Sequence, residues 1–226
     1  MAARFVLLHS PLVGPGCWSR LAPLLRARGH RTLVPDFTAI MRGPPPYYEA
    51  MVALARDAIR SDAFDGPTLL VAHSGAGALV PAIAKGSADL HGAIFLDALL
   101  PHPGQSWFDT ASRELAARHR GRAHNGLVPP WHLWWPPEAL AGMLPDERLR
   151  DSFASELREL PLAYFEERAP ETVMPAHIRC TYIRLSDAYE AEASRAETLG
   201  WHVVRERWHH LAALADAERV ATLLTL

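Results

Sequence analysis

The sequence predicts an α/β fold with a mostly parallel sheet and helices on both of its faces. Short apolar runs at residues 5–8, 32–34, 69–71 and 93–96 lack the alternation of a half-exposed strand, as expected of parallel strands covered on both sides. Segments with apolar residues at helical spacing separate these runs, and Gly29 follows the first helix where helices commonly end. Regular alternation of strand and helix is typical of an open parallel sheet.

This alternation is interrupted once, between residues 99 and 175. The interrupting segment is rich in Pro and Trp and contains no convincing strand, and its apolar-faced helical pieces are expected at 108–119, 137–144 and 148–160. Strand and helix then alternate again at 180–185, 191–199, 201–205 and 216–224. We therefore expect one domain, residues 1–226, with a helical cap inserted at residues 99–175.

Composition excludes several functional classes. A formal net charge of -2, with both signs interspersed, provides no basic face for nucleic acid. No apolar run approaches the roughly 20 residues of a membrane helix, and the first apolar run is too short for a signal peptide. The histidines and the two cysteines lack metal-ligand spacing, so we expect neither metal nor cofactor. We expect a cytoplasmic monomer or homodimer that acts on a small molecule, without nucleic-acid or membrane partners.

Ser74 carries the strongest functional motif of the chain. It follows the apolar run at 69–71, and the small residues Ala72, Gly75 and Ala76 surround it. A tight strand-to-helix turn of this kind exposes a serine hydroxyl above the carboxyl edge of a sheet, because small neighbours let the backbones approach closely. The sequence therefore predicts a nucleophile elbow in which the usual G-x-S-x-G is relaxed to A-x-S-x-A. A helix N-cap is the simpler alternative for this serine.

A nucleophilic serine needs a base, and the base needs a third group to orient it. His209 and His210 follow the last expected strand, and Asp187 follows the strand before it. Asp97, which follows the strand at 93–96, is an alternative acid, although an aspartate there can also bind loop amides. All these positions belong to the carboxyl edge of a parallel sheet, where active sites of such folds form.

Over nearly its whole length the chain resembles an α/β-hydrolase. The opening His-Ser-Pro-Leu-Val-Gly-Pro-Gly-Cys-Trp of residues 9–18 is similar to the methyl esterase and hydroxynitrile lyase branch. The ending His-His-Leu-Ala-Ala-Leu-Ala-Asp-Ala-Glu-Arg-Val is similar to the segment with the family's catalytic histidine. The resemblance implies a triad of Ser74, Asp187 and His210, with His209 as a neighbour of the base. Asp97 stays open as the acid, because some members carry the acid after the earlier strand.

The oxyanion hole departs from the pattern of the resembled family. One donor is expected to be the N–H of Gly75, and the other an N–H from the loop after the first strand. The related pattern His-Gly-x is here His9-Ser10-Pro11, and proline has no N–H to donate. Either the N–H of Leu12 or the hydroxyl of Ser10 replaces it, or the second donor is absent.

Aromatic residues of the expected cap indicate an apolar substrate. We expect a pocket for a hydrophobic or aromatic molecule, lined by His9, Trp107, Trp131 and Trp134, with packing inside the cap as the alternative for each tryptophan. The function expected is hydrolysis of an ester, thioester or lactone through an acyl-enzyme on Ser74. The alternatives are a lyase, a cyclase or a cofactor-free oxygenase on the same scaffold, and a ligand-binding protein with little turnover.

Overall fold

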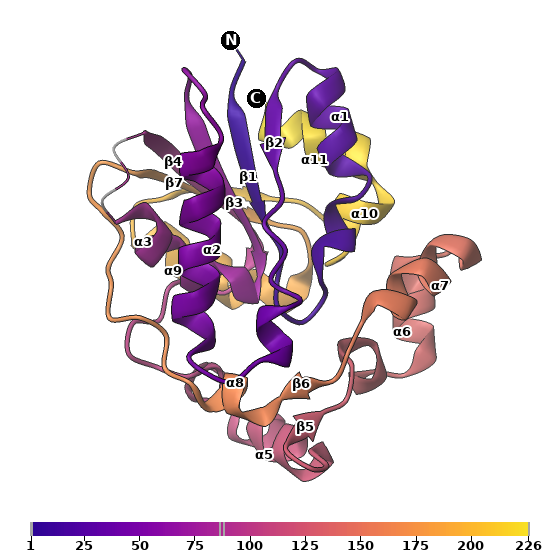
Figure 1. Ribbon diagram of the computed structural model, residues 1–226. Helices are drawn as coiled ribbons and strands as arrows, with labels where there is room; N and C mark the ends of the chain where they lie inside the picture. Colours follow the sequence, from indigo (N-terminus) through magenta and orange to yellow (C-terminus); the bar gives the residue numbers. More distant parts are fainter. Residues whose placement is uncertain (1, 86, 88, 226) are drawn as a thin grey trace.

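The computed structural model describes residues 2–85, 87 and 89–225, and its centre is a six-stranded parallel sheet (Figure 1). The strand order is β2-β1-β3-β4-β7-β8. The strands are β1 (Arg4–Leu8), β2 (Arg31–Leu33), β3 (Thr68–Ser74), β4 (Leu90–Ala98), β7 (Arg179–Arg184) and β8 (His202–Arg205). The expected mostly parallel sheet is confirmed.

Two layers of helices enclose the sheet (Figure 1). From β1 the chain crosses to β2 at one edge of the sheet, and from β2 it crosses back to β3 on the other side of β1. Because both connections are right-handed, their helices, α1 and α2, lie on opposite faces of the sheet. Accordingly, α1 packs beside α11, and α2 packs beside α3. The helices outside the segment between β4 and β7 are α1 (Leu21–Ala27), α2 (Tyr47–Ser61), α3 (Val80–Ala84), α9 (Glu190–Thr198), α10 (Ala212–Ala215) and α11 (Ala217–Leu224).

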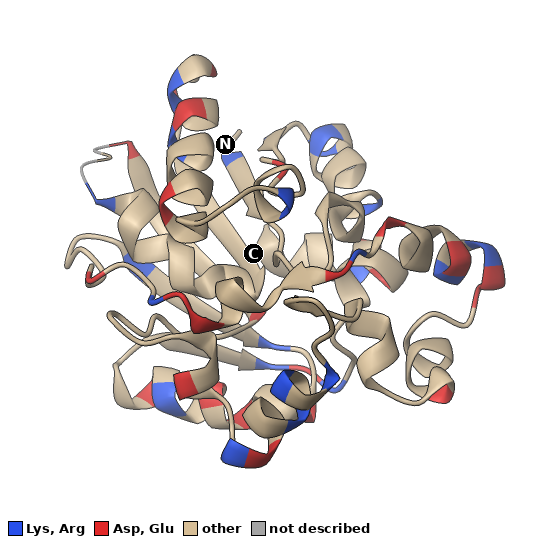
Figure 2. Ribbon diagram, turned by 60° about the horizontal axis from the view of Figure 1, so that its bottom comes forward, with Lys and Arg blue, Asp and Glu red and all other residues tan. Residues whose placement is uncertain are grey.

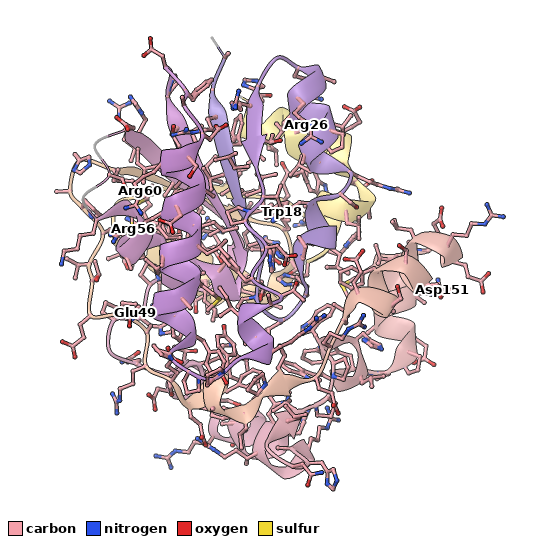
Figure 3. The ribbon with its side chains drawn as sticks, in the orientation of Figure 1. Trp18, Arg26, Glu49, Arg56, Arg60 and Asp151 are labelled. Carbon is pink, nitrogen blue, oxygen red and sulfur yellow. The ribbon has the colours of Figure 1, made fainter. Side chains whose placement is uncertain are left out.

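The core lies on both faces of the central strands. All five residues of β1 are buried, whereas the outer strands β2 and β8 are partly exposed. Burying one Leu, Val or Phe side chain stabilises the fold by about 1.5–3 kcal/mol. A strand that is buried on both faces therefore favours apolar residues at every position, which is why continuous apolar runs predict the central strands better than the outer ones. Trp18, at the end of the 3-10 helix η1 (Pro15–Trp18), is fully buried and labelled in Figure 3.

The segment between β4 and β7 lies beyond the carboxyl ends of the strands (Figure 1). It contains α4 (Trp107–Thr110), α5 (Arg113–Arg122), η4 (Trp131–Trp134), α6 (Pro137–Met143), α7 (Glu147–Glu156) and α8 (Leu162–Glu166). It also contains a short antiparallel pair, β5 (Leu127–Val128) and β6 (Leu160–Pro161), which the sequence did not predict. Two-residue strands are too short to produce a recognisable alternation.

The single helix expected at 108–119 is two helices in the structure. The chain leaves the helical conformation at Ala111, and the Ser112 side chain then caps α5 by accepting a hydrogen bond from Leu115 N–H at 3.2 Å. A serine placed this way satisfies an amide that the first helical turn leaves unpaired. The apolar periodicity therefore located the helical region but not the break within it.

Charged residues of both signs are interspersed along the outer helices (Figure 2). Among the helices of residues 2–85, 87 and 89–225, none combines the length and the apolar character needed to cross a bilayer. Asp151 lies on α7, which extends away from the sheet (Figure 3).

Candidate active site

Ser74 occupies a strained turn at the carboxyl end of β3. Its backbone has φ 56° and ψ −127°, a conformation that residues other than glycine rarely adopt. The 3-10 helix η3 (Gly75–Leu79) begins at the next residue. A Cβ on Gly77 would overlap the carbonyl oxygen of Leu99, so the closest backbone approach falls at Gly77. The structure thus contains the sharp strand-to-helix turn expected at Ser74.

The strand register brings the chain after β1 and the end of β4 to the level of this serine. Leu8 of β1 pairs with Ala72, so Ser10, two residues after Leu8, reaches the level of Ser74, the last residue of β3. On the other side, His73 pairs with Leu96 and Ser74 with Ala98, which leaves Asp97 as a bulge in β4 with φ 45°. A bulge redirects a side chain relative to the regular pleat.

The redirected carboxylate of Asp97 is hydrogen-bonded to His210. His210 Nδ1 lies 2.8 Å from Asp97 Oδ2, and Asp97 is fully buried. Three further hydrogen bonds reach Asp97 from the loop after β7: Leu185 N–H at 2.8 Å, Ser186 N–H at 3.0 Å and the Ser186 hydroxyl at 2.6 Å. Burial acts to raise the pKa of Asp97, but the hydrogen bonds and the charge of His210 outweigh it and hold this pKa below its ordinary value.

The hydrogen bond to Asp97 also defines the protonation of His210. An ionised carboxylate only accepts hydrogen bonds, so Nδ1 of His210 carries the hydrogen and Nε2 is left unprotonated in the neutral ring. His73 adds a second constraint, because its Nε2 lies 2.9 Å from the carbonyl oxygen of His210 and donates to it. The imidazole is therefore held in the tautomer that a general base requires.

The structure corrects the preference for Asp187 as the acid. Asp187 lies in the 3-10 helix η5 (Asp187–Tyr189), and its side chain is 96% exposed and paired with Arg184 at 3.0 Å. It is therefore the alternative acid, Asp97, that contacts His210. Both aspartates follow a strand at the same edge of the sheet, but the bulge turns Asp97 inward and the loop after β7 turns Asp187 to solvent.

His209 does not share the environment of its neighbour. Its Nε2 lies 3.9 Å from Asp216 on the outer side of the loop, and 27% of its side chain is exposed. Burial lowers the pKa of His209 despite the nearby carboxylate. The choice of His210 over His209 as the partner of the acid therefore agrees with the geometry.

Tyr189 is a residue of this site that sequence analysis missed. Its hydroxyl lies 3.3 Å from Ser74 Oγ, and its ring stacks on that of His210 with the centroids 5.0 Å apart and the planes 4° from parallel. The Ser74 hydroxyl is thus paired with Tyr189 and not with His210. An aromatic residue two positions after a candidate acid was the only signal in the sequence, and it is not distinctive.

Two hydroxyl groups converge above Gly75, next to the nucleophile. A Cβ added to Gly75 would lie 3.1 Å from Ser10 Oγ and 3.5 Å from the Tyr164 hydroxyl. Leu12 N–H is not free to act as a donor, because it donates to Ser10 Oγ at 3.2 Å. That bond occupies a lone pair of Ser10 and leaves its hydroxyl hydrogen free. Of the two replacements considered for the missing N–H of Pro11, the geometry therefore favours Ser10.

His9 binds the backbone of its own neighbourhood, contrary to the expected contact with a substrate. Its Nε2 accepts a hydrogen bond from Phe37 N–H at 2.9 Å, so its Nδ1 carries the hydrogen and donates to the Ser10 carbonyl at 2.8 Å. Burial lowers the pKa of His9 to about 4, which keeps the ring neutral. With both nitrogens bound to the backbone, His9 shapes the loop that carries Ser10.

The three predicted pocket tryptophans separate into two groups. The Trp131 ring lies 6.0 Å from that of His210, so it borders the site. Trp107 and Trp134 instead belong to an aromatic cluster within the segment between β4 and β7. There the ring centroids of Trp134 and His119 are 4.0 Å apart, and the Trp134 indole donates to the Pro129 carbonyl at 2.7 Å. For these two residues the alternative of packing within the cap agrees with the structure.

The two reacting side chains are almost completely buried. Ser74 is 4% exposed and His210 is 9% exposed. Trp131 and Tyr189 contribute aromatic surface next to His210. Within the described part of the chain, no group of three His, Cys, Asp or Glu side chains is placed to hold a metal ion.

The site combines a strained serine at the end of a central parallel strand with a histidine–aspartate pair at the same edge of the sheet. This combination is typical of α/β proteins that contain a nucleophile elbow. The model of the alpha/beta hydrolase family matches residues 5–223, and the chain belongs to this family. No curated protein sequence matches the chain.

Several solved structures share the fold at low sequence identity. An extracellular alpha/beta-hydrolase from a Paenibacillus species, described as sharing structural and functional homology with tobacco salicylic acid binding protein 2, has a TM-score of 0.75 and 19% identity, over 98% of this chain and 97% of that chain. A pyrethroid hydrolase from Sphingobium faniae has a TM-score of 0.72 and 20% identity, over 100% and 96%. Tomato methylketone synthase I has a TM-score of 0.73 and 21% identity, over 100% and 97%.

Proposed function

We propose that the chain is a serine hydrolase that cleaves a carboxylic ester, thioester or lactone of a hydrophobic or aromatic small molecule. The observation that supports it most directly is the strained Ser74 beside an Asp97–His210 pair at the same edge of the sheet. A pyrethroid hydrolase and a polyneuridine aldehyde esterase are among the similar structures. The apolar character of the substrate follows from the aromatic rings of Trp131 and Tyr189 around His210.

In this mechanism Ser74 attacks the carbonyl carbon while His210 Nε2 takes its proton. Asp97 keeps the imidazole in the correct tautomer and stabilises the imidazolium that forms. The leaving alcohol or thiol takes the proton from His210, and an acyl-enzyme remains on Ser74. Water activated by His210 then releases the acid. Before attack, Ser74 must turn its hydroxyl hydrogen toward His210 Nε2, while its oxygen keeps accepting from Tyr189. Such tightening of catalytic hydrogen bonds on substrate binding is common.

The oxyanion is stabilised by one backbone donor and by side-chain hydroxyls. The N–H of Gly75 is the first donor, and the Ser10 hydroxyl replaces the N–H that Pro11 lacks. The Tyr164 hydroxyl lies above the same glycine, and burial raises its pKa so that it stays protonated. Neutral hydroxyls held in a buried site can stabilise a tetrahedral intermediate as backbone amides do.

A fluorophosphonate probe tests the proposal. We expect a covalent adduct on Ser74, identified by mass spectrometry of the digested protein, together with hydrolysis of p-nitrophenyl esters. His210→Ala is expected to abolish both labelling and turnover, whereas His209→Ala, its matched neighbour, retains most of each. A folded chain without an adduct on Ser74 contradicts the proposal, and greater damage from His209→Ala contradicts the choice of base.

One observation favours a second candidate function, a lyase, cyclase or cofactor-free oxygenase on the same scaffold. Pro11 removes a backbone oxyanion donor, and loss of one such donor costs about 100- to 1,000-fold in turnover. Chemistry without a tetrahedral intermediate does not need that donor. If the folded chain gives no fluorophosphonate adduct, cyanide-release and oxygen-consumption assays distinguish this candidate from a hydrolase.

A further inference from the structure

Tyr189 touches both reacting groups of the candidate site. Its hydroxyl lies 3.3 Å from Ser74 Oγ, and its ring lies parallel to that of His210 at a centroid distance of 5.0 Å. The reaction described above assigns no chemical role to this tyrosine. A hydroxyl within hydrogen-bond distance of Ser74 Oγ can nevertheless affect each step in which that oxygen forms or breaks a bond.

The loop that carries Tyr189 is the same loop that holds the acid. Leu185 and Ser186 donate hydrogen bonds to Asp97, and Tyr189 N–H then donates to the Ser186 carbonyl at 3.1 Å. The turn is therefore anchored to the buried carboxylate immediately before it presents the tyrosine. Such anchoring holds the hydroxyl at a defined position relative to Ser74.

The phenol of Tyr189 is a neutral hydrogen-bond donor. Burial raises its pKa, and this effect outweighs the opposing hydrogen bond with Ser74. The group therefore keeps its proton at neutral pH. It can donate to Ser74 Oγ, which as a hydroxyl oxygen is a good acceptor.

We propose that Tyr189 is a catalytic residue for deacylation, in which its hydroxyl donates a hydrogen bond to Ser74 Oγ as that oxygen is expelled from the acyl-enzyme. This inference rests on the proposed hydrolase function. Water adds to the ester carbon and gives one proton to His210. The tetrahedral intermediate then collapses: the bond between carbon and Ser74 Oγ breaks, Oγ keeps the electron pair and takes the proton from His210, and the acid leaves. Tyr189 keeps its own proton throughout.

The hydrogen bond acts differently on the two halves of the reaction. In the acyl-enzyme, Oγ is the bridging oxygen of an ester, a weak acceptor, and it becomes a strong acceptor as the bond to carbon breaks. In the free enzyme, Oγ already accepts the hydrogen bond, so acylation gains little from it. Tyr189 therefore accelerates release of the acyl group more than its formation.

Tyr189→Phe isolates this effect, because it keeps the ring that stacks on His210 and removes only the hydroxyl. With a p-nitrophenyl ester under pre-steady-state conditions, we expect an unchanged acylation rate and deacylation slowed by about 10- to 100-fold. The acyl-enzyme then accumulates, giving a burst of nitrophenol and an adduct mass on Ser74. Tyr182→Phe is the matched control, since its buried hydroxyl donates to the Ala98 carbonyl at 2.7 Å and not to Ser74 Oγ, and both rates should stay unchanged.

Two measurements keep the test decisive if Tyr189→Phe is poorly folded. Fluorophosphonate labelling of Ser74 and the melting temperature report whether the site is intact. A fluorinated tyrosine introduced at position 189 keeps the shape and is a stronger donor, so it should accelerate deacylation. Equal slowing of acylation and deacylation in folded Tyr189→Phe overturns the proposed role of Tyr189 but not the hydrolase function. A deacylation rate that changes neither in Tyr189→Phe nor with the fluorinated tyrosine has the same consequence. A wild-type chain that forms no adduct on Ser74 overturns the hydrolase function as well.

Discussion

Asp97 and His210 are 113 residues apart in the sequence, and a hydrogen bond of 2.8 Å joins their side chains. The carboxylate is fully buried and also accepts hydrogen bonds from Leu185 and Ser186. With its oxygens satisfied and water excluded, Asp97 stays ionised and orients the imidazole strongly. This contact links the bulge in β4 to the loop after β8, and the proposed chemistry depends on it.

Asp97→Asn should lower kcat for ester hydrolysis by about 10,000-fold with the fold retained, because the amide can no longer impose the Nδ1-protonated tautomer on His210. Asp187→Asn is the matched control, since this carboxylate is exposed and pairs with Arg184. It should retain nearly full activity. Steady-state kinetics of both variants decide between the two acids, and the opposite ranking would restore Asp187 as the acid.

Ser10→Ala should lower kcat by about 100- to 1,000-fold while KM changes little, because an oxyanion donor acts in the transition state and not on the bound ester. Ser155→Ala serves as the control, since its hydroxyl bonds only the Ser152 carbonyl on an exposed helix. Kinetics with one p-nitrophenyl ester measure both. If Ser10→Ala keeps its turnover, the Tyr164 hydroxyl or a moved loop supplies the second donor.

His9 should make the fold sensitive to mild acid. Its pKa is about 4 in the folded chain and about 6.5 in the unfolded chain, so between these values the unfolded state binds more protons. Its contribution to stability is complete above pH 6.5 and is lost as the pH falls toward 4. At pH 5 the loss amounts to about 2 kcal/mol relative to pH 7.

Urea unfolding at both pH values measures this loss directly. In His9→Gln, the difference between the free energies of unfolding at pH 7 and pH 5 should be about 2 kcal/mol smaller than in the wild type. The exposed His202 provides the control, and His202→Gln should leave that difference unchanged. Equal pH dependence of wild type and His9→Gln would show that His9 is not held neutral by the fold.

Gly77→Ala should destabilise the chain by about 3 kcal/mol or more, because the added Cβ would overlap the Leu99 carbonyl oxygen and displace the turn at Ser74. In Gly121→Ala, on α5, the new Cβ meets no atom within 4 Å. That variant should instead be stabilised by up to about 1 kcal/mol, since alanine favours helix more than glycine does. Thermal melting of the two variants tests the contrast, and equal melting temperatures would contradict the close approach at Gly77.

Sequence analysis located the elbow because its signals are local. The apolar run before Ser74 and the small residues after it reflect contacts within a short stretch of chain, so Ser74 and Gly75 could be recognised without tertiary information. His210 was identified through the resemblance of its segment to a known family. The central strands were predictable for a similar reason: burial on both faces requires apolar residues at every position.

By itself the sequence determined the parallel sheet, the strained serine and the edge of the sheet at which its partners gather, because strand periodicity and turn residues are encoded locally. Three contacts depend on how distant parts of the chain pack: His210 meets Asp97 and not Asp187, the Tyr189 hydroxyl lies next to Ser74, and Trp131 rather than Trp134 borders the site. The physical reason is side-chain direction. Position in the chain tells which edge of the sheet a residue reaches, whereas a bulge or a loop turn decides whether its side chain faces the site or the solvent.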